Sequence, residues 1–286
     1  KELCDIADPT IGVITNVGTA HIGILGSQEN IAKAKKELID SLPDNGVAIL
    51  NGDDPFVIKM GNNFKGNVIA YGLNRKYTVH GSDIIYESEG TKYICTCFDE
   101  AFKAKLHLLG IHNVYNALAA TAAARVLGVD IKKIQKSIDE FVPGQQRQMI
   151  LKIAGITVID DSYNANPLSM KMAFLSLKQM KGNHHILVLG DMGELGKFER
   201  DLHYQVGNIA GKIGFEGLIT VGTLSGEIAK GARESGGIGW IRECQSLNEA
   251  AGCLKENTSE GDVILIKGSH SMHMEKIPQY WKEMLG

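Results

Sequence analysis

Several features that mark whole classes of protein are scarce or missing in this chain of 286 residues. No apolar run approaches the ~18 residues that a membrane-spanning helix needs, so the sequence predicts no membrane span. Basic residues are not in excess, because 30 Lys and Arg stand against 33 Asp and Glu, which argues against a nucleic-acid partner. The five cysteines are odd in number and form no Cys-x-x-Cys motif, so each is expected to be a buried thiol in a reducing cytoplasm.

Two glycine-rich motifs that bind nucleotide phosphates are also missing. No Gly-x-Gly-x-x-Gly follows the first strand expected in the second half of the chain, so we expect no dinucleotide there. No Gly-x-x-x-x-Gly-Lys-Ser/Thr loop occurs, since Gly61–Gly66 has the glycine spacing but continues with Asn67. The chain starts at Lys1 with neither an initiator methionine nor a signal peptide, and we expect it to be a piece of a longer protein.

Alternating strand and helix patterns in the first half predict an α/β fold with a parallel sheet. The predicted elements are strand Gly12–Val17, helix Gln28–Leu42, strands Val47–Leu50 and Val68–Tyr71, and helices Asn113–Leu127 and Ile131–Phe141. Between residues 76 and 108, four short strands separated by glycine and charged turns (Tyr77–Val79, Asp83–Tyr86, Lys92–Thr96 and Ala104–Leu108) predict antiparallel additions to this sheet.

A second alternating segment starts at about residue 148. Its predicted strands are Thr157–Asp160, His185–Leu189, Gly217–Val221, Gly239–Ile241 and Val263–Lys267, and its predicted helices are 167–180, 199–213, 224–235, 246–256 and 271–285. This succession is typical of a Rossmann-like, doubly wound domain. The turn-forming segment Pro143-Gly144-Gln145-Gln146 predicts a boundary between two domains, 1–145 and 146–286.

The most informative segment of the chain is Asp160-Asp161-Ser162-Tyr163-Asn164-Ala165-Asn166-Pro167. It connects a predicted strand to a predicted helix, for which Asn166 is a suitable N-cap and Pro167 a suitable first residue. Carboxylates, amides, a hydroxyl and a phenol therefore crowd the carboxyl end of a strand, where open α/β sheets bind ligands. The alternative is that Asp, Ser and Asn serve here only as turn and capping residues.

Lys35 is an anomaly in the helix predicted over 28–42. It lies on the same face as the apolar stripe of Ile31, Ala34, Leu38 and Leu42, whereas the lysines at 33 and 36 point away. A lysine in an apolar stripe either reaches to the edge of that stripe or has a functional role.

Three polar residues elsewhere in the first half are candidates for ligand binding. Asn113 and Asn116 are one helical turn apart, so their amides face the same way, and a carboxamide matches the N6 and N7 edge of adenine. The alternative for Asn113 is a helix cap. His21 follows a predicted strand on the carboxyl side of the sheet and is either structural or a ligand.

Five segments in register resemble the Mur ligases, and within that family the UDP-N-acetylmuramoyl-tripeptide–D-alanyl-D-alanine (MurF-like) ligases. They are Thr15–His21, Gly110–Ala120, Asp161–Met170, Leu189–Gly196 and Ile266–Ser269. The resemblance runs from about residue 10 to the C-terminus. It implies a truncated central ATPase domain, with a parallel sheet plus antiparallel strands, followed by a C-terminal Rossmann-like domain. The N-terminal domain and the phosphate-loop part of the central domain would precede Lys1.

The resemblance also assigns roles to residues at matching positions. It implies that Lys35 is carbamylated and acts in catalysis and Mg²⁺ binding together with His21, although imidazole is an unusual magnesium ligand. The implied ATP-binding residues are His112, Asn113, Asn116, Arg147 and Asp161. The implied substrate-binding residues are Ser162, Tyr163, Asn164, Asp191, Glu194, Lys267, Ser269 and His270. Relatives often have arginine at the position of His270, and a histidine cannot bind a carboxylate through two hydrogen bonds as arginine does.

The activity implied by the resemblance is that of an ATP-dependent carboxylate–amine ligase of peptidoglycan synthesis. The intact enzyme would phosphorylate the terminal carboxylate of UDP-N-acetylmuramoyl-tripeptide, and the amine of D-alanyl-D-alanine would attack the acyl phosphate. We expect ATP and Mg²⁺ as cofactors, a cytoplasmic monomer, and no nucleic-acid or membrane partner; the chain alone, without the phosphate loop, is expected to be inactive. The alternatives are a related ligase of folylpolyglutamate or cyanophycin synthesis, or a non-catalytic module that binds a nucleotide or dipeptide.

Overall fold

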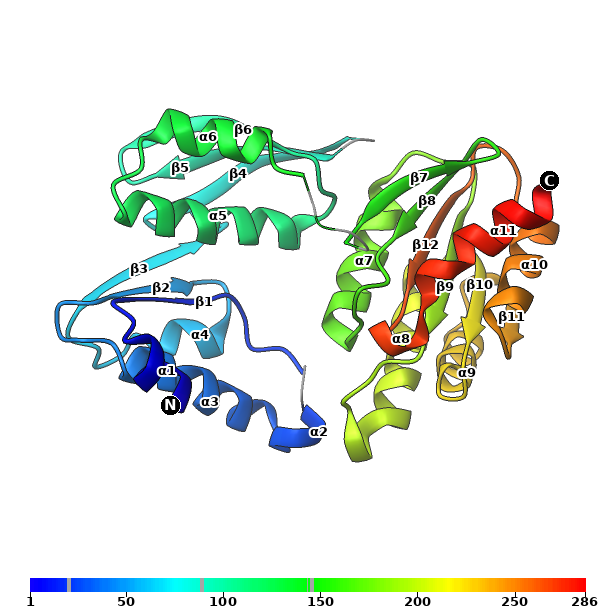
Figure 1. Ribbon diagram of the computed structural model, residues 1–286, viewed down its shortest axis with the longest axis horizontal. Helices are drawn as coiled ribbons and strands as arrows, with labels where there is room; N and C mark the ends of the chain where they lie inside the picture. The colour runs from blue at the N-terminus through cyan, green and yellow to red at the C-terminus, as the bar shows by residue number, and fades with distance from the viewer. Residues whose placement is uncertain (20–21, 88–89, 143, 145–146) are drawn as a thin grey trace. The chain divides into compact units, whose positions relative to one another are not determined.

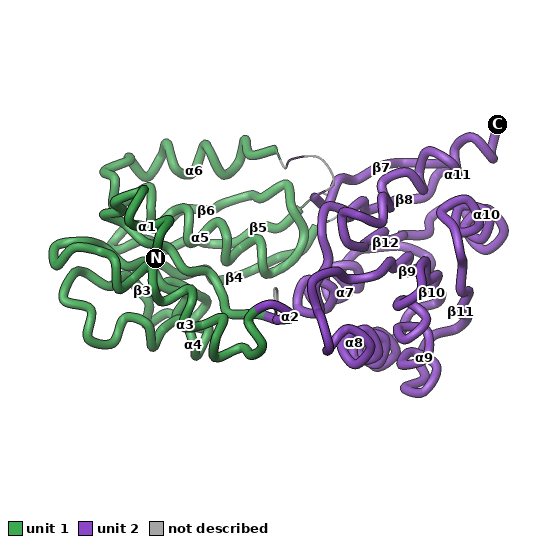
Figure 2. Tube along the Cα trace, turned by 60° about the horizontal axis from the view of Figure 1, so that its bottom comes forward, with its two compact units in different colours: residues 1–18, 25–142 green, residues 19–24, 143–286 purple. Residues whose placement is uncertain are grey.

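The computed structural model describes residues 1–19, 22–87, 90–142, 144 and 147–286, which divide into two compact units. Unit 1 comprises Lys1–Gly18 and Leu25–Val142, and unit 2 comprises Thr19–Ile24 and Pro143–Gly286 (Figure 2). Each unit is built on a mostly parallel sheet, so the predicted α/β class is confirmed. Most of the predicted boundary segment lies outside the described residues, because Pro143, Gln145 and Gln146 are not among them.

Unit 1 has its strands in chain order across one sheet (Figure 1). The strands are β1 (Ile11–Ile14), β2 (Val47–Asn51), β3 (Asn67–Gly72), β4 (Val79–Glu87), β5 (Gly90–Cys97) and β6 (Glu100–Leu106). The helices are α1 (Glu2–Ala7), α3 (Gln28–Asp40), α4 (Pro55–Lys59), α5 (Ile111–Val126) and α6 (Ile131–Asp139), and the short α2 (Ile22–Leu25) spans the residue limit between the units. Strands β1 to β4 pair in parallel and β4 to β6 pair antiparallel, which confirms the antiparallel addition.

Two details of unit 1 differ from the prediction. The first strand ends at Ile14 instead of Val17, because the Val17 N–H donates to the carboxylate of Asp54 and not to a neighbouring strand. No separate strand forms at 77–79, since only its last residue, Val79, belongs to β4, which also contains the strand predicted at 83–86. The pairing of β4 with β5 shifts register between Ser82 and Ile85. Such a β-bulge lets one strand absorb what the sequence pattern presents as a turn.

The alanine-rich helix α5 forms one face of the unit 1 core. Its buried side chains pack on the sheet beside Ile49 and Tyr71, while α3 and α4 lie on the other face (Figure 1). Small alanine side chains let a helix lie close to a sheet. The start of α5 lies near the carboxyl end of β2, because the Tyr115 hydroxyl donates to Asp53, which follows that strand.

Unit 2 has the strand order β11-β10-β9-β12-β8-β7. The strands are β7 (Met149–Ile153), β8 (Ile156–Asp160), β9 (His185–Gly190), β10 (Phe215–Val221), β11 (Ile238–Cys244) and β12 (Val263–Lys267). The helices are α7 (Pro167–Gln179), α8 (Glu199–Ile213), α9 (Ser225–Ser235), α10 (Leu247–Asn257) and α11 (Ile277–Leu285), with 3₁₀ turns at Gly196–Phe198, His270–Met272 and Met274–Lys276. All neighbouring strands are parallel except the pair β7–β8.

Two elements of unit 2 were not predicted correctly. Strand β7 was missed; it pairs with β8 through the two-residue turn Ala154-Gly155, in which both residues have positive φ. Residues of that kind form the tight turns that match the twist of a β-hairpin. The helix predicted over 271–285 begins only at Ile277, because His273 adopts the left-handed conformation (φ 50°) and interrupts the helix.

The order of the strands makes the carboxyl end of β12 the place in unit 2 where a ligand site is expected. Helices α7, α8 and α9 lie together on one face of the sheet, and α10 and α11 cover the other (Figure 1). The chain therefore leaves β8 and β9 toward one face and leaves β12, which lies between them, toward the other. Open α/β sheets bind ligands where neighbouring strands diverge in this way, at their carboxyl ends.

The helices of the structure were compared with the requirements for a membrane-spanning segment. Across the described ranges, none of them combines the length and the apolar character needed to cross a bilayer.

Candidate functional site

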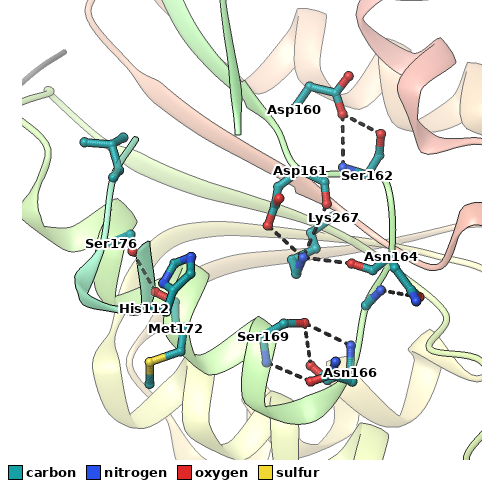
Figure 3. A network of polar contacts seen from close by, with 12 residues as sticks. His112, Asp160, Asp161, Ser162, Asn164, Asn166, Ser169, Met172, Ser176 and Lys267 are labelled. Carbon is teal, nitrogen blue, oxygen red and sulfur yellow. Dashed lines mark hydrogen bonds and ion pairs between the residues drawn. The ribbon is translucent and has the colours of Figure 1, made fainter. Parts of the chain in front are cut away.

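Lys267 and Asp161 form an ion pair at the carboxyl ends of β12 and β8. Lys267, the last residue of β12, places its Nζ 2.7 Å from Oδ2 of Asp161, 3.3 Å from the Asp161 carbonyl oxygen and 2.9 Å from the carbonyl oxygen of Asn164 (Figure 3). The lysine side chain is only 4% exposed. An ammonium group has three donors, and here each donor has an acceptor in the loop that follows β8. The lysine therefore fixes that loop against β12.

Asp160 and Ser162 turn inward from the same loop. The Asp160 carboxylate is buried and accepts hydrogen bonds from both the backbone N–H and the hydroxyl of Ser162, which is itself fully buried (Figure 3). Burial raises the pKa of Asp160, and the two hydrogen bonds from Ser162 oppose that rise. The Ser162 side chain thus stabilises the turn, which corresponds to the local role considered as the alternative for this segment.

The start of α7 follows the predicted capping pattern. The Asn166 side chain accepts a hydrogen bond from the Ser169 N–H, and the Ser169 hydroxyl accepts one from the Asn166 N–H. Pro167 occupies the first helical turn. This reciprocal cap limits the freedom of the loop at its far end, so the loop is held at both ends.

Arg147, Tyr163 and His270 form an exposed group beside the ion pair. The guanidinium carbon of Arg147 lies 3.9 Å from the centroid of the Tyr163 ring, in cation–π geometry, and the His270 ring centroid lies 5.9 Å from the same ring. Tyr163 is 45% exposed. The structure therefore brings together three side chains to which the resemblance assigned ligand contacts. A phenol and two basic groups that face solvent can bind an anion.

Asp191 and Ser269 connect the loops that follow β9 and β12. The Asp191 carboxylate accepts a hydrogen bond of 2.6 Å from the N–H of Ser225, the first residue of α9, and caps a helix that has no side-chain cap of its own. The Ser269 N–H donates to the Asp191 carbonyl oxygen (2.9 Å), and the Ser269 hydroxyl accepts from the Gly193 N–H (2.6 Å). Glu194 is exposed in the same loop with a φ of 60°, and its carbonyl oxygen accepts from the Gly23 N–H.

A buried histidine that the sequence analysis did not single out supports this loop. His203 on α8 bonds through Nδ1 to the Glu199 carbonyl oxygen (2.6 Å), and its Nε2 accepts from the Met192 N–H (2.8 Å). Since a carbonyl oxygen can only accept and an N–H can only donate, the ring is neutral with its proton on Nδ1. Burial lowers the pKa of His203, in agreement with this assignment.

In unit 1, Lys35 lies on the inward face of α3, between the buried residues Ile31 and Ile39. The predicted stripe is wrong at Ala34, which is exposed, because the inward face of the helix is centred on Lys35. The Lys35 ammonium donates to the Asn16 carbonyl oxygen (2.6 Å) near the carboxyl end of β1. Burial lowers the pKa of Lys35, and the carboxylate of Asp54 opposes that shift.

The α5 residues implied in ATP binding lie together in its first two turns. The Asn113 side-chain nitrogen donates to the Leu109 carbonyl oxygen (2.9 Å) and lies 3.3 Å from Nε2 of His112. The Asn116 amide nitrogen is 3.4 Å from the Asn113 amide oxygen. Because the helix begins at Ile111, Asn113 is not its N-cap, which removes the capping alternative.

The predicted metal site is only partly covered by the structure. His21 lies outside the described residues. Within the part of the chain that the structure describes, no cluster of three His, Cys, Asp or Glu side chains is suited to hold a metal ion.

Polar residues at the ends of β2 and β3 were missed by the sequence analysis. Asp53 accepts hydrogen bonds from the Leu73 N–H (2.6 Å) and from the Tyr115 hydroxyl of α5 (3.0 Å). Burial and the neighbouring Asp53 raise the pKa of Tyr115. The signal was present, because Asn51-Gly52-Asp53-Asp54 follows a predicted strand in the same way that Asp160 and Asp161 follow theirs.

Comparisons with known proteins agree with this arrangement. Residues 1–124 match the Mur ligase middle domain, and residues 146–270 match the glutamate ligase domain of Mur ligases. The UDP-N-acetylmuramoyl-tripeptide–D-alanyl-D-alanine ligase of Bacillus subtilis is 35% identical over 280 residues, which cover 96% of this chain and 60% of that protein. The chain thus spans about 60% of the length of this relative.

Two solved structures have the same fold as this chain. A crystal structure of MurF from Acinetobacter baumannii superposes with a TM-score of 0.87 at 28% identity and covers 97% of this chain and 60% of its own. MurF ligase from Thermotoga maritima, solved in complex with ADP, has a TM-score of 0.87 at 24% identity over 99% of this chain and 64% of its own, and that degree of identity supports the fold alone. With the middle domain and the glutamate ligase domain both matched, in the order in which the two units occur, the chain belongs to the Mur ligase family.

Proposed function

We propose that this chain is the middle and C-terminal part of an ATP-dependent ligase that joins D-alanyl-D-alanine to UDP-N-acetylmuramoyl-tripeptide in cytoplasmic peptidoglycan synthesis. The observation that carries the proposal is the similarity to the Bacillus subtilis ligase along nearly the whole chain. Because the chain spans only part of that relative, the complete reaction is proposed for the longer protein.

The first two turns of α5 are proposed to bind the adenine of ATP. Asn113 and Asn116 present adjacent carboxamides there, with His112 beside them. A carboxamide offers both a donor and an acceptor, as the N6 and N7 edge of adenine requires. The Asp53 carboxylate holds the same turn through Tyr115, so the two amides start from a fixed position.

Lys35 and His21 are proposed to hold Mg²⁺, which, when bound, would neutralise negative charge on the phosphates of ATP. The surroundings of Lys35 suit carbamylation, because a partly buried amine with a lowered pKa has a larger neutral fraction, and only the neutral amine combines with carbon dioxide. The carbonyl oxygen of Asn16 would lie next to the modified nitrogen of Lys35, since it accepts a hydrogen bond from that nitrogen in the structure.

Unit 2 is proposed to position the reacting groups. Asp161 would contact the ribose of ATP, with its carboxylate held by Lys267, and Arg147 would contact the phosphates from its place over Tyr163. The residues proposed to surround the peptide substrates are Asn164, Asp191, Glu194, Ser269 and His270. Ser162 would shape the loop that follows β8. Positioning of this kind suits phosphoryl transfer, where catalysis depends largely on alignment and charge neutralisation.

Nucleotide binding by the 286-residue chain provides the first test. Titration with ATP in a calorimeter should detect weak binding, and Asn116→Ala should weaken it by about tenfold, as expected for loss of one two-bond base contact. Asn62→Ala, which removes an exposed amide from a distant turn of unit 1, is the matched control and should bind like the unsubstituted chain. Equal affinity in all three proteins would remove Asn116 from the proposed site.

The ligation itself is tested with the complete protein that contains this chain. It should release phosphate from ATP only when both UDP-N-acetylmuramoyl-tripeptide and D-alanyl-D-alanine are present, and mass spectrometry should detect the pentapeptide product. Release driven by a folate or by a cyanophycin primer would assign the protein to a different ligase reaction. A complete protein that binds ATP and catalyses no ligation would support a binding module instead.

A further inference from the structure

The thiols of Cys244 and Cys253 are in contact, with their sulfur atoms 3.6 Å apart. Cys244 is the last residue of β11 and is 2% exposed, whereas Cys253 lies on α10 and is partly accessible. The ATP and substrate contacts proposed above use neither residue. This contact therefore needs a separate explanation.

The start of α10 fixes the relative position of the two thiols. The Ser246 hydroxyl accepts from the Glu249 N–H (3.2 Å), and the Glu249 carboxylate accepts from the Gln245 N–H (2.7 Å). These two hydrogen bonds tie the start of the helix to Gln245, the residue that follows β11. Ala250, Ala251 and Leu254 are fully buried under the sheet, so the helix cannot rotate without losing its core contacts. Cys253 is thus held toward Cys244.

A second pair of cysteines in the chain lacks this geometry. Cys95 and Cys97 are two residues apart on the same face of β5, and both are fully buried in the unit 1 core. Residues two apart on a strand are separated by roughly 6.6 Å along it. A disulfide needs Cβ atoms only ~3.5–4.5 Å apart, so these two thiols cannot be joined without distorting the strand.

We propose that Cys244 and Cys253 form a reversible disulfide when the protein meets a peroxide. The more accessible Cys253 thiolate attacks one oxygen of hydrogen peroxide, which forms a sulfenic acid and releases hydroxide that is protonated to water. The Cys244 sulfur then attacks the sulfenyl sulfur, the S–S bond forms as the S–O bond breaks, and the Cys244 proton leaves with the hydroxide as a second water. Two thiols lose two electrons and two protons, and peroxide is reduced to two waters.

The surroundings of each thiol set the order of these steps. Burial and the neighbouring Cys253 raise the pKa of Cys244 to about 12, so Cys244 is a poor first nucleophile. Once Cys253 is oxidised, Cys244 is already in contact with it and reacts as the resolving thiol. Reduction by a dithiol restores the starting state through thiol–disulfide exchange.

The cross-link should stiffen the edge of unit 2 next to the Asp191 loop. The Cys244 carbonyl oxygen accepts from the Gly222 N–H (3.4 Å), and a side chain at Gly222 would collide with the Asp191 carboxylate, so the two loops are in close contact. Closing the short loop between Cys244 and Cys253 removes freedom from the unfolded chain. Oxidation should therefore raise the midpoint of thermal unfolding of unit 2 by several degrees.

Peptide mapping tests the proposal on the unsubstituted chain. After brief treatment with hydrogen peroxide, thiols are blocked and the protein is digested with trypsin and then with a glutamate-specific protease. Trypsin keeps both cysteines on one peptide, Glu243–Lys255, and cleavage after Glu249 divides that peptide between them. The two parts should remain joined until dithiothreitol is added, and titration of the denatured protein should find two fewer thiols than before oxidation.

Two variants control for other cysteines. Cys4→Ser should still form the cross-link, whereas Cys253→Ser should lose both the cross-link and the rise in the unfolding midpoint. If the two halves of the peptide separate in the oxidised, unreduced protein, with both thiols blocked, the proposal is wrong. A disulfide that joins Cys253 to another cysteine, or the same midpoint shift in Cys253→Ser, would equally overturn it.

Discussion

Lys267 and Asp161, which are 106 residues apart in the sequence, form an ion pair of 2.7 Å between the ends of β12 and β8. Both side chains are largely shielded from water, with 4% and 17% exposure. The family resemblance implied that Asp161 contacts ATP and that Lys267 contacts the substrate, and it did not imply that the two residues contact each other. Because the two side chains are in contact, loss of the Lys267 ammonium group would change the position of the Asp161 carboxylate.

Replacement of Lys267 should destabilise unit 2. Lys267→Met keeps the apolar stem but leaves the Asp161 carboxylate and two carbonyl oxygens without the ammonium, and removal of one partner of a shielded ion pair costs about 3 kcal/mol or more. Urea denaturation of the two proteins measures the difference in unfolding free energy. The control is Arg200→Ala, which breaks the ion pair of an arginine that is 73% exposed and should cost at most ~1 kcal/mol. Equal losses in the two variants would contradict the assignment.

Acid should weaken unit 2 through His203. The pKa of His203 is lowered in the folded state, so its contribution to stability is complete above the unfolded pKa of about 6.5 and is lost as the pH falls through the lower folded value. Denaturation curves between pH 7 and pH 5 should show this loss. His203→Gln retains a donor and an acceptor without titrating, so it should flatten the dependence. A slope unchanged by this substitution would show that other groups cause it.

Lys35 should be essential in the complete protein. Lys35→Ala removes the proposed carbamate, so the ligase rate should fall to background and recover in part when a short-chain carboxylic acid supplies the missing oxygens. Lys33→Ala, an exposed neighbour on the same helix, should retain normal activity. Phosphate release with both substrates measures all three proteins, and a fully active Lys35→Ala enzyme would refute the role.

Residues 148–286 should fold alone. This stretch contains all of the unit 2 sheet from β7 to β12 and the helices that cover both of its faces. A polypeptide with one complete core is expected to unfold in a single cooperative transition. Thermal unfolding followed by circular dichroism in the near and far ultraviolet tests this, and a gradual loss of signal or an insoluble product would place the domain boundary elsewhere.

The 286-residue chain alone should neither hydrolyse ATP at an enzymatic rate nor form the amide bond. Its sequence contains no phosphate-binding loop of the Gly-x-x-x-x-Gly-Lys-Ser/Thr kind. Loss of even one preorganised donor to a developing anion costs roughly 3–4 kcal/mol, or about 10²–10³ in rate. A phosphate-release assay with magnesium, bicarbonate and both peptide substrates measures this, and turnover near ~1 s⁻¹ would contradict it.

Local features of the fold could be predicted because they depend on neighbours in the sequence. The cap of α7 by Asn166, the first-turn Pro167 and the strand that ends at Asp160 are all specified within a few residues. The adjacency of Asn113 and Asn116 follows from helical periodicity in the same way. The prediction was wrong where the local sequence pattern was weak, as at β7. It was also wrong where the backbone conformation of one residue interrupted a helical pattern, as at His273.

Contacts between distant segments could not be predicted, since they depend on the order of strands in the sheet. Nothing near Asp191 in the sequence indicates that its carboxylate caps α9 at Ser225, and nothing near Met192 indicates that its N–H meets the ring of His203. A buried polar group must find a partner, but the partner is whichever group the folded sheet brings within reach. Sequence patterns therefore identified which residues gather at the carboxyl ends of the strands, and the packing of those strands selected which of them meet.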